Sequence, residues 1–133
     1  MEKFDTSKTI QLISGSIDKI TMASIYSAVQ QNDQKRLVLV FKKIHAADIA
    51  DFLEQVNRSQ RKSIVNLWGD SINGEVLSEL EEGVRYELIE VIPDESLVKS
   101  IRKLQTGDLV HLIEDLNDKK KKNYFSFLRN QNE

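Results

Sequence analysis

A twelve-residue repeat of apolar residues runs through most of this chain of 133 residues and limits what it can fold into. Three series of positions, each advancing by twelve residues, are apolar or aromatic at twenty of their twenty-one positions. The first series is Leu53, Val65, Leu77, Ile89, Ile101, Ile113 and Phe125. The second is Val56, Trp68, Leu80, Ile92, Leu104, Leu116 and Leu128. The third is Phe52, Ile64, Val76, Leu88, Ser100, Leu112 and Tyr124, in which Ser100 is the exception.

Within one repeat the apolar spacing is that of an amphipathic helix. Ile49, Phe52, Leu53 and Val56 follow the pattern i, i+3, i+4, i+7, which predicts one apolar stripe. A helix of eight or nine residues is only about 12 Å long and is marginal alone, so each must pack on its neighbours. The sequence therefore predicts an all-α fold, a right-handed superhelix (α-solenoid) of about ten short helices.

Polar residues divide the stripes at regular intervals. Turns are expected at residues 57–59, 69–71, 81–83, 93–94, 105–107 and 117–118. Asp70, Asp94, Thr106 and Asp118 recur at one phase of the repeat, where side chains cap helices or acids occupy the first turn. Pro93 suits a first turn or the loop before it.

The beginning of the chain is less regular. Ser14, Gly15 and Ser16 are expected to break an initial helix, a longer helix is expected over residues 17–29, and a turn over residues 30–33. The next helix is expected to start near Lys35. We divide the chain into an N-terminal helical extension, residues 1–33, and a helical superhelix, residues 34–133.

The composition excludes several classes of protein. Apolar residues make up 40% and charged residues 30% of the chain, and there is no cysteine. This excludes disulfides and thiolate metal sites and favours the cytoplasm. The longest apolar run, residues 37–41, is far shorter than the ~20 residues of a membrane helix, and no secretory signal opens the chain. We expect no direct membrane insertion.

The net charge of −2 conceals an uneven distribution. Residues 1–47 carry seven basic and four acidic groups, whereas residues 48–133 carry twelve basic and seventeen acidic groups. Residues 70–95 alone hold nine acids and one base, Arg85. This acidic window opposes nucleic acid and favours cations or basic partners. The basic run of residues 119–122 is expected to be a solvated turn.

No catalytic constellation is present. The chain lacks a metalloprotease motif, a nucleophile elbow and a glycine-rich phosphate loop, so we do not expect an enzyme. The two histidines, His45 and His111, are expected at the surface or at helix caps. Packing explains the aromatic residues of the three series, Trp68, Tyr124 and Phe125, whereas Phe127 falls outside them and is expected to cover the end of the stack or to contact a following segment.

The carboxylates are the remaining candidates for a functional site. Asp48 and Asp51 suit a first helical turn, and Glu75 and Glu79 share one helix face. Asp108, Glu114 and Asp115 form a later acidic group. Because Mg²⁺ takes one or two carboxylates and keeps several waters, it leaves no spacing pattern. A hydrated face that serves solubility is the alternative. The pattern of an EF-hand is absent.

Three motifs resemble the cytoplasmic N domain of MgtE magnesium transporters. Residues 44–54, IHAADIADFLE, resemble the family pattern Ile-His-Pro-x-Asp-Φ-Ala-x-Φ-Φ-Glu, where Φ is apolar. Residues 75–80, EVLSEL, are similar to the family's Glu-Val-Leu helix. Residues 107–116, GDLVHLIEDL, resemble the segment Asp-Asp-Φ-Ala-Asp-Φ-Φ-x-x-Φ. The resemblance covers roughly residues 30–128.

The resemblance implies a regulatory function. Members of the family carry this helical domain ahead of tandem CBS domains, a connecting helix and a dimeric five-helix membrane pore. It implies that Mg²⁺ bridges carboxylates of the N and CBS domains when it is abundant and that the pore then closes. When Mg²⁺ is scarce, like charges repel, the domains separate and the pore can open.

Carried over by position, the resemblance implies two metal-contacting residues, Glu75 and Asp108. The acidic pair of the family aligns with Gly107 and Asp108, so only Asp108 is kept. A later family Asp falls at His111, which with Glu114 could act weakly, and Ala46 replaces the usual Pro. The departures at Gly107 and His111 bear on the number of ions, whereas Ala46 bears on the turn and not on the chemistry.

The resemblance also implies the setting of the chain. We expect weak regulatory Mg²⁺ binding shared with a CBS domain, contacts with the CBS domains and connecting helix of the same transporter, and no nucleic acid partner. A homodimer is expected only for the full-length protein, on the cytoplasmic side of the cell membrane, of which this chain would be a fragment or truncated product. The alternative is a Mg²⁺-independent interaction solenoid that resembles the flagellar motor switch protein FliG.

Overall fold

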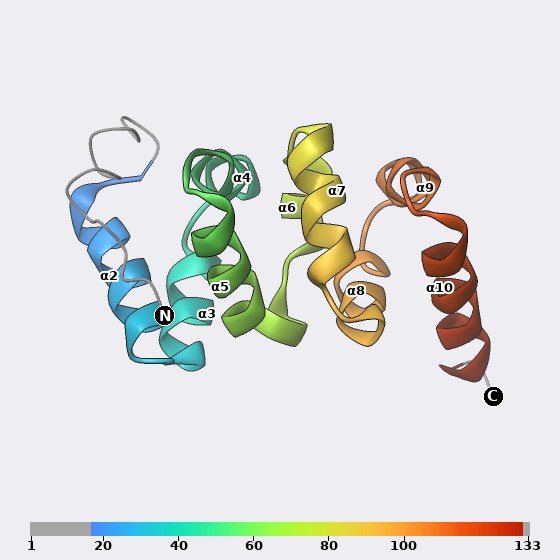
Figure 1. Ribbon diagram of the computed structural model, residues 1–133, viewed down its shortest axis with the longest axis horizontal. Helices are drawn as coiled ribbons and strands as arrows, with labels where there is room; N and C mark the ends of the chain where they lie inside the picture. The colour runs from blue at the N-terminus through green and yellow to red at the C-terminus, as the bar shows by residue number, and fades with distance from the viewer. Residues whose placement is uncertain (1–16, 132–133) are drawn as a thin grey trace. The chain divides into compact units, whose positions relative to one another are not determined.

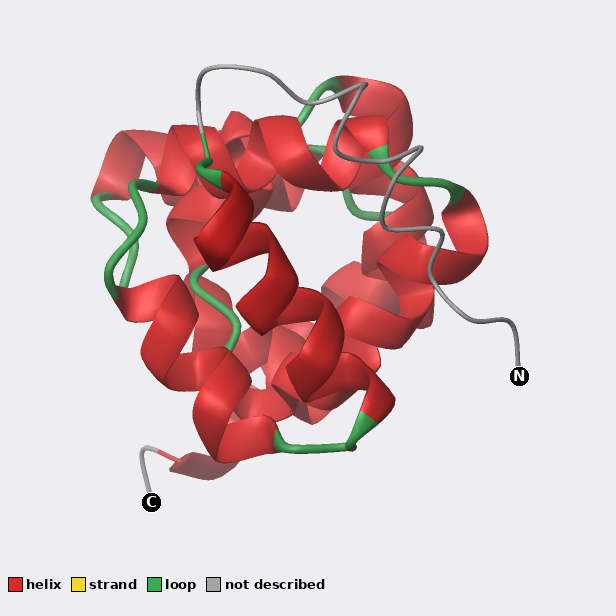
Figure 2. Cartoon of the chain, turned by 90° about the vertical axis from the view of Figure 1, so that its left-hand side faces the viewer, coloured by secondary structure: helices red, strands yellow, loops and turns green. Residues whose placement is uncertain are grey.

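The computed structural model describes residues 17–131, and every regular element in that range is a helix (Figures 1 and 2). The all-α prediction is confirmed. The helices are α2 (Lys19–Gln30), α3 (Gln34–Lys42), α4 (Ala46–Gln55), α5 (Arg58–Trp68), the 3₁₀ turn η1 (Gly69–Ser71), α6 (Gly74–Glu79), α7 (Glu82–Val91), α8 (Asp94–Ile101), α9 (Thr106–Glu114) and α10 (Asp118–Gln131). They form two compact units that divide between residues 68 and 69. The superhelical arrangement of the whole chain stays a prediction.

Helix starts repeat every twelve residues, as the apolar pattern predicts. From α4 onward they fall at residues 46, 58, 82, 94, 106 and 118. The one gap in this series of helix starts is at residue 70, which lies in the 3₁₀ turn η1. The short helix α6 follows η1. The repeat of the sequence is therefore a repeat of structure.

In the first unit, two aspartates begin the first two helices. The amide N–H of Thr21 donates to Asp18 at 2.7 Å, and that of Arg36 donates to Asp33 at 3.2 Å, so each side chain satisfies an N–H group that the helix leaves free. Between the two helices, Asn32 has a φ of 55°, a left-handed conformation that Asn tolerates. The expected helix over residues 17–29 and the expected turn after it are confirmed, whereas residues 14–16 lie outside the described range.

The core of the first unit is built from α2, α3 and α5, with α4 contributing its apolar face. α2 packs on α3, and both contact α5. The ring centroids of Phe41 in α3 and Trp68 in α5 lie 4.5 Å apart. Those of Phe52 in α4 and Tyr26 in α2 lie 6.0 Å apart. Trp68 is buried, as expected for a packing residue.

In the second unit, α8 is the central element, and it contacts η1, α6 and α10. A close approach explains the polar exception in the third apolar series. A Cβ added at Gly74 of α6 would lie 2.2 Å from the carbonyl oxygen of Ser100 in α8. The small, buried Ser100 satisfies its own hydroxyl by donating to the carbonyl of Leu97 at 2.8 Å. Two small residues therefore let these helices meet.

The three series supply most of the core of both units. Their members are buried with few exceptions, of which Ile113, Leu104 and Leu128 are partly exposed. Phe125 is the clear error, because 49% of its surface is exposed. Phe125 lies in α10, and no later helix among the described residues packs on its side chain. Tyr124 beside it is buried.

Several local predictions are wrong. Residues 119–122 belong to α10 and are not a turn. Five helices begin inside an expected turn, at its last residue or at the residue before it: α5, α7, α8, α9 and α10. In two of these turns an asparagine caps the helix: Asn57 accepts from the amide of Gln60 at 2.8 Å, and Asn117 from that of Lys120 at 2.8 Å. Pro93 is the N-cap residue of α8, and Asp94 and Asp118 lie in first turns, as expected.

Candidate functional site

Glu75 lies in the first turn of the short helix α6, with its side chain exposed. The side chain of Asn73 caps this helix by accepting from the amide N–H of Glu75 at 2.9 Å. No residue of the described range forms an ion pair with the Glu75 carboxylate. Its backbone is therefore held while its charge stays available to solvent.

Asp108 has a similar position in α9. It lies in the first turn of that helix, and the N-cap residue Gln105 makes no side-chain hydrogen bond to the helix. The carboxylate therefore balances the positive end of the helix dipole. Its side chain is exposed, and no ion pair to it occurs within residues 17–131. A Cβ added at the neighbouring Gly107 would meet no atom within 4 Å.

The structure does not gather these acids into a complete metal site. Among residues 17–131 no group of three or more His, Cys, Asp or Glu side chains could hold a metal ion. Glu75 and Asp108 are therefore exposed carboxylates of the second unit that belong to no group of three such ligands. A divalent cation held by either would take most of its remaining oxygen ligands from water or from another domain.

Other acids of the window at residues 70–95 already have partners. Asp70 accepts a short hydrogen bond from the hydroxyl of Ser96 and one from Lys99 Nζ at 3.0 Å. The bond from Ser96, together with the charge and hydrogen bond of Lys99, lowers the pKa of Asp70 below its ordinary value. The same contact raises the pKa of Lys99. This carboxylate is therefore ionised and engaged within the fold.

Asp94 is held by α10. Lys120 Nζ lies 2.7 Å from one of its carboxylate oxygens, and the side-chain amide of Asn123 donates to the other at 2.5 Å. Lys120 also donates to the carbonyl of Ile92 at 3.2 Å. Glu90 accepts from the amide of Asn117 at 2.9 Å. Sequence reasoning missed these partners, because they lie 26 to 29 residues away along the chain and no local pattern links them.

Neither histidine completes a site. His45 is exposed at the N-cap position of α4, without a side-chain hydrogen bond to the helix. Its carbonyl accepts from the amides of Asp48 and Ile49 at 3.0 and 3.1 Å. His111 is exposed in the last turn of α9. The prediction that both lie at the surface is confirmed.

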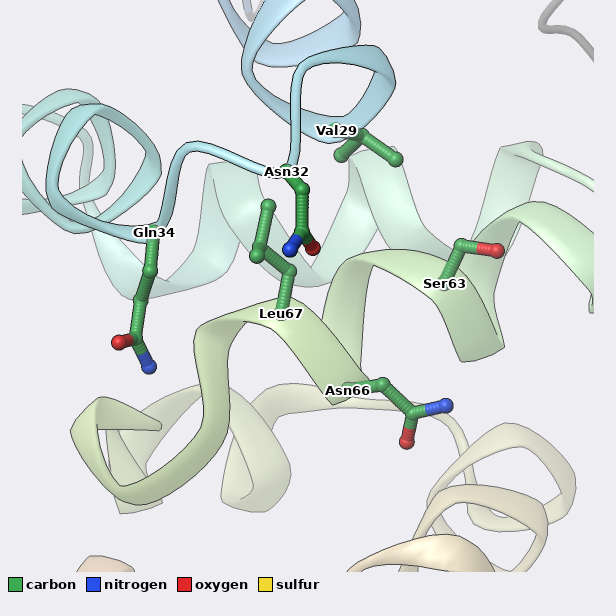
Figure 3. Close-up of a pocket in the computed structure, with 6 residues that line it drawn as sticks. All are labelled: Val29, Asn32, Gln34, Ser63, Asn66 and Leu67. Atoms are coloured by element: carbon green, nitrogen blue, oxygen red, sulfur yellow. The ribbon is translucent and has the colours of Figure 1, made fainter.

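A cavity of about 450 Å³ opens in the first unit, between the turn after α2 and helix α5 (Figure 3). The Gln34 side chain donates to the carbonyl of Trp68 at 3.4 Å beside it. The lining has no charged side chain, so it does not suit a cation. It consists of Val29, Asn32, Gln34, Ser63, Asn66 and Leu67.

Comparison with known proteins identifies the family. None of the helices between residues 17 and 131 combines the length and apolar character that a membrane span requires. No curated protein and no solved structure matches the chain significantly. The family model of the MgtE intracellular N domain matches residues 44–133, which include Glu75, Asp108 and the three motifs. The chain therefore belongs to the MgtE intracellular N domain family, the N-terminal domain of MgtE-type magnesium transporters.

Proposed function

We propose that this chain is the cytosolic Mg²⁺-sensing domain of an MgtE-type magnesium transporter, and that it regulates the pore and catalyses no reaction. The observation that carries the proposal is the family match over residues 44–133. Two features of the site support it. Glu75 and Asp108 are exposed, and each lies in the first turn of a helix of the second unit.

The residues present fit a shared cation contact and not a closed one. Mg²⁺ prefers oxygen ligands, keeps several waters and often takes only one or two carboxylates. The described residues form no group of three such ligands. We therefore propose that Glu75 and Asp108 supply one half of each contact and that a CBS domain of the same transporter supplies the other.

The gating mechanism follows from the charges. A bound divalent cation supplies positive charge that carboxylates on two domains can share. Without it, Glu75 and Asp108 repel acidic groups on the facing domain, which favours separated domains. The equilibrium between the two arrangements shifts only by the difference in cation affinity between them. The domain is proposed to act in this way on the cytoplasmic side of the membrane, beside the connecting helix of a homodimeric transporter.

Titration of the chain alone tests the cation contact. Mg²⁺ added to ¹⁵N-labelled protein is expected to shift the amide signals of residues 74–78 and 106–111, with a dissociation constant of about 1 mM or weaker. The double variant Glu75→Gln, Asp108→Asn should lose these shifts. Asp51→Asn, which removes an exposed carboxylate of α4, is the matched control and should retain them. Tight stoichiometric binding by calorimetry would contradict a shared site.

Gating is tested in a transporter that carries this chain as its N domain. The double variant should require more Mg²⁺ to close the pore than the Asp51→Asn control, as measured by channel recordings in membrane patches. If both variants close at the same Mg²⁺ concentration as the parent, Glu75 and Asp108 are not the sensing residues. Partner capture that does not change with Mg²⁺ would favour the interaction solenoid instead.

A further inference from the structure

The outward face of α10 is a basic stripe that the proposed Mg²⁺ contact does not use. Its inner face packs on the second unit through buried Tyr124 and through Lys120 and Asn123, which hold Asp94 of α8. In Figure 1 the other helices of this unit lie on one side of α10. Side chains on the opposite side of α10, among them Lys119, Lys122 and Arg129, are exposed in the described structure.

We define this outward face by five exposed residues. Steps of three or four residues connect them along the helix, from 119 to 122, from 122 to 125 and 126, and from these to 129, so they lie along one side of it, over about 15 Å. The residues of the outward face are Lys119, Lys122, Phe125, Ser126 and Arg129. Asp118, also exposed, begins the helix at the end of the same face.

The three cations of the outward face are not used within the fold. Lys120 of the same basic run is paired with Asp94. By contrast, no described residue forms an ion pair with Lys119, Lys122 or Arg129. Their charges are available to a partner, in a chain that is acidic on average.

An aromatic ring lies in the middle of this row of cations. Phe125 is 49% exposed, although it belongs to a series of otherwise mostly buried positions. Its ring packs edge to face on buried Tyr124, with the centroids 5.4 Å apart. A large apolar group among cations, anchored on the core and open to water, suits a partner that is both anionic and apolar.

We propose that the outward face of α10 binds the surface of an anionic phospholipid bilayer. Lys and Arg side chains on one helix face are attracted to anionic headgroups, and an aromatic ring among them can insert at the boundary with the acyl chains. A single-stranded nucleic acid fits less well. It needs several stacking aromatics, and only Phe125 is exposed on this face, since Tyr124 is buried and Phe127 is partly covered.

The expected strength is modest. Each Lys or Arg near an anionic bilayer contributes about a fivefold increase in binding, so three contribute about a hundredfold in low salt. The acidic window of the same chain opposes this attraction. Binding should therefore be detectable at millimolar lipid and fall steeply as salt rises. The inference does not depend on the proposed Mg²⁺ site.

Vesicle sedimentation of the whole chain tests the inference. Vesicles of phosphatidylglycerol and phosphatidylcholine in equal parts are compared with vesicles of phosphatidylcholine alone, at low salt with a chelator in place of Mg²⁺. The chain should bind only the anionic vesicles. The triple variant Lys119→Glu, Lys122→Glu, Arg129→Glu should lose binding at least tenfold, and Phe125→Ser should lose about threefold.

The control variant makes the same change of charge elsewhere. Lys35→Glu, Lys42→Glu, Lys43→Glu alters three exposed lysines at α3 and its C-cap and should reduce binding much less than the triple variant. Circular dichroism checks that every variant keeps its helix content. An equal loss in both triple variants would show that only net charge matters and would overturn the proposal. Absence of binding to anionic vesicles would also overturn the proposal. This holds whether or not the chain binds single-stranded DNA or associates with itself through this face.

Discussion

The guanidinium of Arg85 in α7 reaches Asp115, the C-cap residue of α9, with Nη2 2.6 Å from Oδ2. Its Nη1 also donates to the carbonyl of Leu80 at 2.9 Å. Arg85 is buried, and it is the single base in the acidic window of residues 70–95. The positive charge of Arg85 is therefore paired inside the second unit. It does not neutralise the negative charge of the exposed acids of the window, such as Glu75.

Loss of this ion pair should destabilise the fold. In Asp115→Asn the buried guanidinium loses its charged partner, and we expect the free energy of unfolding to fall by about 2 kcal/mol. Urea denaturation followed by circular dichroism measures the change. Asp118→Asn removes an exposed carboxylate nearby in sequence and should cost much less. Equal costs for the two variants would show that the pair contributes nothing specific.

The close approach of α6 and α8 predicts intolerance of a methyl group at residue 74. Because the added Cβ would lie 2.2 Å from the carbonyl oxygen of Ser100, Gly74→Ala must separate the two helices, at a cost of about 1–3 kcal/mol in stability. Gly107→Ala is the control, since its Cβ would meet no atom within 4 Å. That variant should be neutral or stabilise by about 0.5 kcal/mol. Thermal unfolding of both variants tests the contrast.

Open space at Gly107 allows a gain-of-function test of the proposed site. Gly107→Asp would place a second carboxylate beside Asp108, as in the acidic pair that the family carries at this point. We expect Mg²⁺ to bind about threefold more tightly or better, because affinity rises with the number of charged ligands. The ¹⁵N titration measures this. Gly107→Asn adds a side chain of the same shape without charge, and an equal gain for it would argue against a carboxylate contact.

The Asp70 contact predicts a pH dependence of stability. Its pKa is lowered in the fold, first by the hydrogen bond from Ser96 and then by Lys99. A lowered pKa contributes stability above the ordinary value of 3.8, and this is lost as the pH falls through that value toward the folded-state pKa. The difference in unfolding free energy between the parent and Asp70→Asn should therefore be present at pH 7 and shrink below pH 4. A constant difference would contradict this account, and the effect should be small because the carboxylate is exposed.

Much of the fold could be predicted because its information is local. The apolar spacing within a repeat decides which face of a helix is buried, so the core positions around Phe52, Ile64 and Leu88 follow from the sequence. Helix boundaries did not follow from the apolar spacing, because a single cap such as Asn57 moves a helix start by a residue or two. Phe125 was misplaced, since periodicity does not reveal which positions of α10 have a packing partner within the described residues.

The candidate site was predictable only in part. Glu75 begins the helix that the EVLSEL motif predicts and Asp108 follows an expected turn; the structure places both in first helical turns and leaves both exposed. The state of the other acids was not predictable. Asp70 and Asp94 look alike in sequence to the acids that stay free, yet Lys99 and Lys120, 29 and 26 residues later, neutralise them.

The sequence by itself therefore determined the helical class, the twelve-residue spacing of the helices and the concentration of acid between residues 70 and 95. These depend on periodicity and composition, which are properties of neighbouring residues. Only the tertiary structure decided which acids are paired, why Ser100 replaces an apolar residue opposite Gly74, and that Lys122 and Phe125 face solvent together. Ion pairs and close helix contacts depend on distances between residues far apart in the chain, and these exist only once the helices are packed.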